Sequence, residues 1–170
     1  MKIEIRKAVL KDTSQIVVLT KELWDFHKDW KPSFVVVKKN GIKIFEEYCK
    51  KSIRSKYGIV FVAIVNDELV GYIFAKRDFL PPVFKNTENV YDLKGLMLKK
   101  GFRRQGLGKR LINELEKELK RRKVNLYTLN VNPRNKKAHD FYKKNNLKDF
   151  NMVMVKKLWL KKLEQLSQLL

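Results

Sequence analysis

Residues 96–111 read LMLKKGFRRQGLGKRL, an apolar run that leads through a basic, glycine-containing turn into an amphipathic helix. Gly106 and Gly108 let the backbone approach a ligand where a Cβ would otherwise stand. The first N–H groups of the following helix lack intrahelical partners, and together with the positive end of the helix dipole they favour an anion. Three side chains add positive charge at the same place: Arg103, Arg104 and Lys109. The stretch therefore predicts a strand, loop and helix that hold a pyrophosphate.

Two familiar phosphate loops are excluded by spacing. Leu107 stands where a Walker A loop needs its lysine, and no Ser or Thr follows it for magnesium. A dinucleotide fingerprint needs a third small residue three positions after Gly108, where this chain has Leu111. The remaining pattern is Arg-x-x-Gly-x-Gly after a strand, and by itself it fits a basic turn at a helix start equally well.

A second motif downstream decides between these two interpretations. Residues 132–142 read NPRNKKAHDFY and follow the first motif after a predicted helix and strand. The two motifs, in this order and at this separation, resemble the acetyl-coenzyme A site of the GCN5-related N-acetyltransferase (GNAT) superfamily. The resemblance extends less specifically over residues 2–157. It implies an α/β (α+β) GNAT fold, in which a mixed, mostly antiparallel sheet of about seven strands is flanked by helices. Coenzyme A would lie in a splay between two central strands.

Length and composition fit one compact domain. The chain has 170 residues, 44% of them hydrophobic, which is enough to bury a core. No apolar run is long enough to span a membrane. The first residues alternate between apolar and polar side chains, and we expect no signal peptide. The single Cys49 cannot form an internal disulfide. We therefore expect a cytoplasmic protein with one domain over residues 1–157.

Hydrophobic periodicity predicts the order of the elements. Strands are expected at residues 2–7, 59–65, 69–77, 90–99, 124–131 and 148–157. Helices are expected at residues 14–30, 42–55, 106–122 and 133–144. Cys49 falls on the apolar face of its helix, where a packing role is expected. Residues 158–170 form an amphipathic tail, which would pack on its own domain or, as the alternative, on a second copy in a homodimer.

The charge is strongly positive, with 39 Lys and Arg against 18 Asp and Glu, a net charge of +21. An anionic coenzyme needs only a few of these cations, so the excess has another origin. It could contact nucleic acid or an acidic partner, or form a solvated, lysine-rich surface. We favour the solvated surface because the chain has no basic low-complexity tail and no aromatic-interleaved nucleic-acid motif.

Acetyl transfer to an amine requires three groups. Only roughly one primary amine in 2,500 is neutral at pH 7, so a base must accept a proton before the amine attacks. The oxyanion that forms needs N–H donors, and the departing thiolate needs an acid. The resemblance implies that Tyr142 is the acid and that the main-chain N–H of Leu98 is the oxyanion donor. Asp92 is the candidate base, with a solvent-facing strand residue as the equally fitting alternative.

The resemblance also implies the residues that contact the coenzyme: Leu96, Met97, Leu98, Arg103, Arg104, Gln105, Gly106, Leu107, Gly108, Lys109, Asn130, Asn135, Ala138, Phe141 and Tyr142. Asn135 fits a polar residue at a helix start as well. Five residues near the first helix and a proline loop are candidates for the acceptor pocket: His27, Trp30, Phe34, Phe79 and Phe84. His27 and His139 lack partners at ligand spacing, so no metal is expected.

The sequence therefore predicts an N-acetyltransferase that moves acetyl from acetyl-CoA to a primary amine. The acceptor would be a small amine, a lysine side chain or a protein N-terminus. Strong positive charge argues mildly against a polycationic acceptor. Two alternatives of other classes are a non-catalytic acyl-CoA sensor and a nucleic-acid-associated basic protein.

Overall fold

Within the residues that the structure describes, five strands form one sheet in the order β1-β2-β3-β4-β5. The structure is a computed structural model, and it describes residues 2–26, 37–78, 89–152 and 154. The strands are β1 (Ile3–Lys7), β2 (Gly58–Val65), β3 (Glu68–Arg77), β4 (Val90–Leu98) and β5 (Leu126–Leu129). Strands β1 to β4 pair antiparallel, whereas β5 pairs parallel to β4. The sheet is therefore mixed and mostly antiparallel, as expected.

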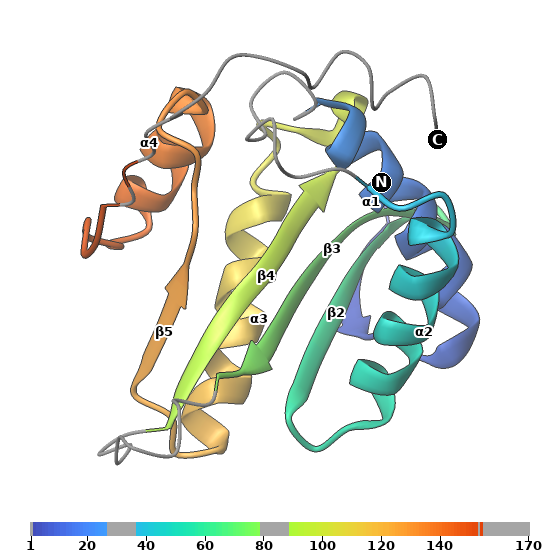
Figure 1. Cartoon of the computed structure of the whole chain (residues 1–170), viewed down its shortest axis with the longest axis horizontal. Helices are drawn as coiled ribbons and strands as arrows, with labels where there is room; N and C mark the ends of the chain where they lie inside the picture. The colour runs from blue at the N-terminus through green and yellow to red at the C-terminus, as the bar shows by residue number, and fades with distance from the viewer. Residues whose placement is uncertain (1, 27–36, 79–88, 153, 155–170) are drawn as a thin grey trace, which may run out of the picture.

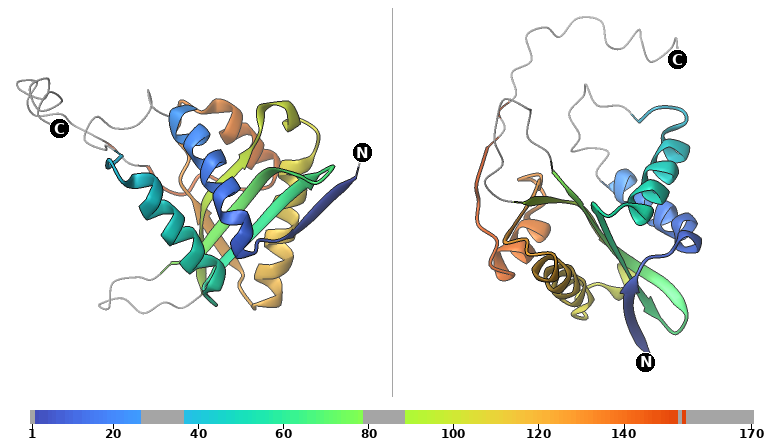
Figure 2. Two further views of the ribbon diagram at one scale, coloured as in Figure 1. Left: turned by 90° about the vertical axis from the view of Figure 1, so that its right-hand side faces the viewer. Right: turned by 90° about the horizontal axis from the view of Figure 1, so that it is seen from below.

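Helices cover both faces of the sheet (Figures 1 and 2). They are α1 (Thr13–Phe26), α2 (Gly41–Arg54), α3 (Leu107–Arg121) and α4 (Lys136–Lys144). Two short 3-10 turns, η1 (Leu10–Asp12) and η2 (Lys100–Phe102), precede α1 and the loop before α3. Helices α1 and α2 lie on one face, and α3 and α4 lie on the other. The chain is thus a three-layer sandwich in the part that is described.

Helix α3 packs on the sheet through the apolar stripe that the sequence predicts. Each side chain of the stripe is at most 3% exposed: Leu107, Leu111, Ile112, Leu115 and Leu119. They form one core cluster with residues of β2, β3 and β4. Burial of each such side chain contributes about 1.5–3 kcal/mol, so α3 is held firmly along its whole length. This packing fixes the N-terminus of α3 beside the end of β4.

The opposite face of the sheet packs against α1 and α2. Ile16 and Leu19 of α1 meet Cys49 of α2 over the rings of Tyr72 and Phe74. Cys49 is fully buried, and burial raises the pKa of its thiol to about 11. The thiol therefore stays protonated and has a packing role, as the sequence predicts.

Strands β4 and β5 separate halfway along β4. They are paired only from Val90↔Leu126 to Leu93↔Leu129, although β4 continues to Leu98. The separation begins where β4 contains a bulge, because Leu93 pairs with Ala75 and Gly95 with Phe74, which leaves Lys94 as the extra residue. A bulge bends its strand and increases the local twist. The two strands consequently diverge toward the end of the sheet where α3 begins (Figure 1).

Several expected boundaries are wrong. The described part holds five strands and not about seven, and residues 148–152 of the expected strand 148–157 are not in a strand. Phe150, Met152 and Met154 alternate as a strand would, but they are 94%, 81% and 87% exposed, and a strand is not stable without a paired edge or a covered face. The strand expected at 124–131 is only Leu126–Leu129, and helix α4 begins at Lys136 and not at residue 133.

Some predictions fall outside the described residues, namely the end of the first helix after Phe26, the tail 158–170 and the homodimer it would form. Strands β2 and β3 are joined by a tight hairpin, in which Asn66 and Asp67 both have positive φ. None of the helices in the described part is long and apolar enough to cross a membrane.

Candidate active site

The loop before α3 forms the open end of the site. Gly106 is the residue before the helix and has φ +79°, a left-handed conformation that glycine adopts without strain. A Cβ built on Gly106 meets no described atom within 4 Å, so the space above this turn is open. The first bond of the helix runs from the N–H of Arg110 to the carbonyl of Gly106. The N–H groups of the preceding helical residues are left free of intrahelical bonds at the open turn.

Hydrogen bonds of its own side chains fix the shape of this loop. The Nε of Arg103 donates to the carbonyl oxygen of Leu98 at 2.8 Å, which ties the loop to the end of β4. Gln105 Nε2 donates to the carbonyl oxygen of Gly101 at 2.9 Å. Arg104 and Lys109 are exposed at the rim, so their charges are available to an anion bound at the turn.

Gly108 is required by a different constraint, the approach of α4. A Cβ on Gly108 would lie 3.1 Å from Cζ of Phe141, closer than an ordinary van der Waals contact. The same Cβ would lie 3.7 Å from a methyl carbon of Leu98. Gly108 therefore lets α3, α4 and the end of β4 come together. This contact brings the two sequence motifs to one place.

Beyond its pairing with β5, β4 has an edge that no described strand pairs, although the carbonyl of Leu98 accepts from Arg103. Lys99 donates its N–H to the carbonyl of Val70 at 2.8 Å, so these two residues form a hydrogen-bonded pair of the β3–β4 ladder. Such pairs alternate along an antiparallel ladder, and the backbone groups of Leu96 and Leu98 therefore point away from β3. Strand β5 does not reach them, since its pairing ends at Leu93. A ligand with amide groups can pair with this edge as an added strand does.

Helix α4 closes the other side of the opening. Asn135 precedes the helix, and its Oδ1 accepts a hydrogen bond from the N–H of Ala138 at 3.2 Å. The alternative interpretation of Asn135, a helix cap, is therefore realised. Asn130 follows directly after β5 and is exposed.

Tyr142 lies on α4 beside the separated strands. It packs against the α3-side core, and its ring is 5.4 Å from that of Phe141 in an edge-on arrangement. Burial raises the pKa of Tyr142 to about 12. The phenol therefore keeps its proton at every physiological pH. Tyr142 is thus chemically suited to donate a proton.

Asp92 lies on the opposite face of the sheet, where the strands part. Its neighbours Tyr91 and Leu93 point into the core under α3, so the side chain of Asp92 points toward the α2 side. The side chain is 14% exposed, and its Oδ2 accepts a hydrogen bond from Nζ of Lys94 at 2.5 Å. The candidate base is therefore already paired with an ammonium group.

The sequence analysis does not predict the ion pair between Lys94 and Asp92. Burial lowers the pKa of Lys94, but the hydrogen bond and charge of Asp92 outweigh it, with smaller contributions from Tyr48 and Asp78, and the net shift is upward. Lys94 thus remains charged. The signal was present in the sequence, because residues two apart on a strand share a face. The bulge that brings Lys94 to the point of separation is visible only from the pairing of the strands.

The sequence also predicts five residues of the acceptor pocket. His27, Trp30, Phe34, Phe79 and Phe84 lie outside the residues that the structure describes. Within the described part, no group of His, Cys, Asp and Glu residues could hold a metal ion.

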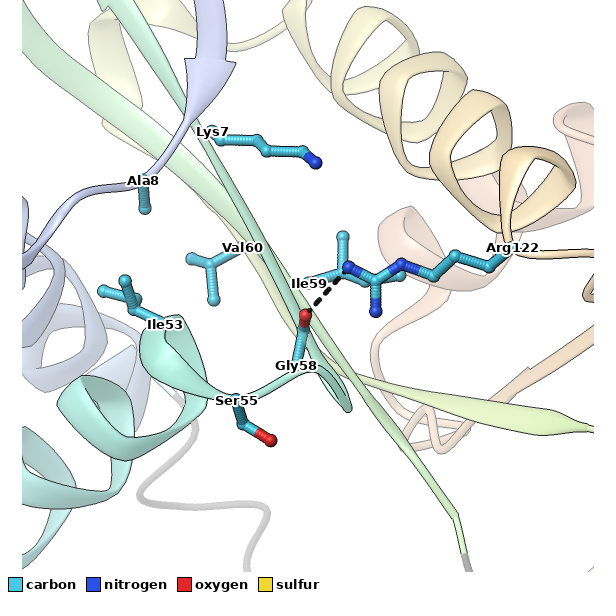
Figure 3. Close-up of a pocket in the computed structure, with 8 residues that line it drawn as sticks. All are labelled: Lys7, Ala8, Ile53, Ser55, Gly58, Ile59, Val60 and Arg122. Carbon is cyan, nitrogen blue, oxygen red and sulfur yellow. Dashed lines mark hydrogen bonds between the residues drawn. The ribbon is translucent and has the colours of Figure 1, made fainter.

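A separate cavity of about 140 Å³ lies at the far end of the sheet, where β2 begins (Figure 3). Its polar lining comes from Lys7, Ser55 and Arg122. The guanidinium of Arg122 donates to the carbonyl oxygens of Lys56 and Gly58 and to Glu118. These donors are used to join the end of α3 to the start of β2. The cavity is a structural junction and not a second reactive site.

Comparison with known proteins agrees with this geometry. A spermidine N(1)-acetyltransferase of Thermoplasma acidophilum is 26% identical over 155 residues, which is 87% of this chain and 89% of the relative. The solved structure of a Bacillus halodurans protein, in tetramutant form, has a TM-score of 0.78 at 17% identity, covering 91% of this chain and 99% of that one. A predicted acetyltransferase from Clostridium acetobutylicum, solved with acetyl-CoA, has a TM-score of 0.72 at 18% identity, covering 92% and 97%.

The profile of the acetyltransferase (GNAT) family matches residues 20–146, well over half of the chain. This range contains the glycine loop, the separated strands and the motif at the start of α4. The chain therefore belongs to the acetyltransferase (GNAT) family.

Proposed function

We propose that the chain is an acetyl-CoA-dependent N-acetyltransferase that transfers the acetyl group directly to a primary amine. The observation that carries this proposal is the separation of β4 from β5 after Leu93. The separation leaves a free backbone edge between the N-terminus of α3 and Tyr142. Each of these three parts matches one chemical part of acetyl-CoA.

The residues present fit the coenzyme. Its pyrophosphate suits the N-terminus of α3, where the space above Gly106 is open and Arg104 and Lys109 are exposed. Its pantetheine arm carries amide groups, which suit the backbone groups of Leu96 and the N–H of Leu98 on the edge that β5 does not pair. When bound, acetyl-CoA would supply an activated acetyl thioester at the inner end of the separated strands.

The chain's own groups then supply the three functions that amine acetylation needs. The N–H of Leu98 is the proposed donor to the developing oxyanion, because it lies on the edge of β4 that β5 does not pair. Tyr142 is the proton donor for the departing thiolate, because burial keeps the pKa of its phenol high and the phenol protonated. Asp92, or a water molecule that it binds, receives the proton from the acceptor amine.

The relative from Thermoplasma acidophilum is named for spermidine, which makes spermidine one acceptor to test here. The described residues near Asp92 balance their negative charges with lysines, which favours an acceptor other than a polycation. The acceptor class is therefore considered separately below.

Calorimetric titration with acetyl-CoA, free coenzyme A and ATP tests the coenzyme site. We expect binding of both coenzyme A forms and a loss of affinity of roughly tenfold or more in Lys109→Glu, which reverses a charge at the N-terminus of α3. Lys120→Glu is the matched control, because it makes the same change at the other end of the same helix. If wild type bound neither acetyl-CoA nor free coenzyme A, the proposal would be refuted. If Lys109→Glu and Lys120→Glu lost the same affinity for coenzyme A, the N-terminus of α3 would not be the pyrophosphate site.

A further inference from the structure

We propose that the acceptor is an amino-acid-like amine, with its ammonium and an anionic group one or two carbons apart. Asp92 binds the ammonium group and Lys94 binds the anionic group. This inference rests on the proposed function, since it names the acceptor class of the same site.

The position of the two side chains is the first argument. Lys94 is the bulged residue of β4 and the first one beyond the pairing with β5. The side chains of Asp92 and Lys94 lie on the face of the sheet that α2 covers, with Tyr48 of α2 near both of them. Tyr142 and the N-terminus of α3 belong to the other face. An acceptor that approaches from the α2 side therefore meets Asp92 and Lys94 before it reaches the opening.

The balance of charge at this place is the second argument. Lys94 interacts with Asp92 and also with Asp78 at the end of β3. A second cation, Lys76, is the strand partner of Asp92, and its Nζ lies 4.8 Å from the centre of the Tyr48 ring. Two carboxylates thus face two ammonium groups in the described part of this surface. Because these charges cancel, this surface offers a polycation no net attraction.

The ion pair itself indicates what an acceptor must carry. A simple amine that takes the place of Lys94 on Asp92 leaves the ammonium of Lys94, whose side chain is 39% exposed, without the attraction of its carboxylate partner. An amine that also carries an anionic group replaces one ion pair by two and leaves no charge unpaired. Asp92 and Lys94 are two residues apart on β4, and their side chains contact each other. The two charges of the acceptor must therefore be close together, as in an α- or β-amino acid.

Amino acids and their amides provide the matched acceptors for a test. The amide removes the negative charge and keeps the size, and its less basic amine is chemically the easier one to acetylate. Release of coenzyme A thiol is measured with both series and with spermidine. We expect kcat/KM at least tenfold higher for the best amino acid than for its amide or for spermidine, although intrinsic reactivity favours the amide.

Two lysine variants assign this preference to the site. In Lys94→Gln we expect the preference for the amino acid over the amide to fall to near unity, through a higher KM for the amino acid, while kcat/KM for spermidine rises. Lys120→Gln is the matched control, an exposed lysine on α3 that faces away from the site, and it should retain the full preference. Calorimetric binding of acetyl-CoA by each variant verifies that it is folded.

The outcomes separate this inference from the proposed function. If acetyl-CoA binds and the amides or spermidine react as well as the amino acids, the inference is overturned and the proposed function stands. A preference that survives in Lys94→Gln also overturns it, as does binding of acetyl-CoA without acetylation of any compound in the panel. If acetyl-CoA does not bind, the proposed function fails and the inference fails with it.

Discussion

The proposed role of Tyr142 as proton donor depends on the surroundings of its side chain. Phe141 and Tyr142 are neighbours on α4, but Phe141 packs against the position of Gly108, and Tyr142 lies at the separated strands. Burial raises the pKa of Tyr142 to about 12, well above its usual value. A group with a raised pKa keeps its proton until the pH approaches that value. Tyr142 therefore remains an acid over the whole range in which the protein is expected to work.

Replacing Tyr142 by Phe removes the proton and keeps the packing. We expect kcat to fall by about 10²–10⁴-fold, the usual contribution of general acid catalysis, while affinity for acetyl-CoA changes only a few-fold. Tyr127→Phe is the control, because its hydroxyl donates to Glu116 at 3.0 Å on the α3 side. Steady-state kinetics from pH 6 to pH 10 provide the measurement. If wild-type kcat fell at alkaline pH because Tyr142 lost its proton well below pH 10, the assignment would be contradicted.

At the scale of the elements, α3 positions the coenzyme end of the site because both of its ends are anchored. The C-terminal end is held by Glu118, which is 6% exposed and accepts hydrogen bonds from Arg121 and Arg122 at 2.8–2.9 Å. Lys7 of β1 adds an ion pair at 3.2 Å. The hydrogen bonds from Arg121, then those from Arg122 and Lys7, outweigh burial and lower the pKa of Glu118 to about 2.

This network predicts a specific dependence of stability on pH. A carboxyl whose pKa is lowered by folding stabilises the protein above its unfolded pKa, near 4.5, and the contribution disappears as the pH falls toward 2. Glu118→Gln should therefore reduce the free energy of unfolding by about 2–3 kcal/mol at pH 7, and the difference from wild type should shrink below pH 4.5. Urea denaturation at several pH values measures it. Glu114→Gln, which breaks the more exposed pair with Lys117, should change stability by less than about 1 kcal/mol. Equal effects of the two variants, or a Glu118→Gln difference that does not depend on pH, would contradict this account.

The sequence predicts some elements well because their patterns are local. The stripe from Leu107 to Leu119 and the glycine loop before it can be recognised without any knowledge of the sheet. The bulge at Lys94 cannot, since it depends on the register between β3 and β4. The prediction of a strand at 148–157 is wrong over residues 148–152 for a related reason. Alternating apolar residues indicate a strand, but the strand forms only where it can pair with a neighbouring strand. The helix-capping role of Asn135 could be assigned only from the structure. The same side-chain amide atoms can cap a helix or contact a ligand, so the sequence does not distinguish the two roles.

For the molecule as a whole, the two motifs are brought together by packing across the sheet. The N-terminus of α3, the free edge of β4 and the start of α4 lie at the same end of the sheet (Figure 1). The net charge of +21 adds a long-range attraction for an anionic coenzyme, which accelerates association at low ionic strength. The selectivity for the coenzyme comes from the local arrangement, because surface charge alone does not discriminate among polyanions.

The central claim is that an acetyl group passes from acetyl-CoA to an amine at the opening between β4 and β5. The most direct measurement is mass spectrometry of the small-molecule products after incubation with acetyl-CoA and a mixture of amino acids, their amides and spermidine. The account predicts an N-acetylated amine formed in equal amount to the free coenzyme A, and about a hundredfold or more less of it with Tyr142→Phe. Tight binding of acetyl-CoA without any acetylated amine would contradict the account and identify the chain as a non-catalytic acyl-CoA sensor.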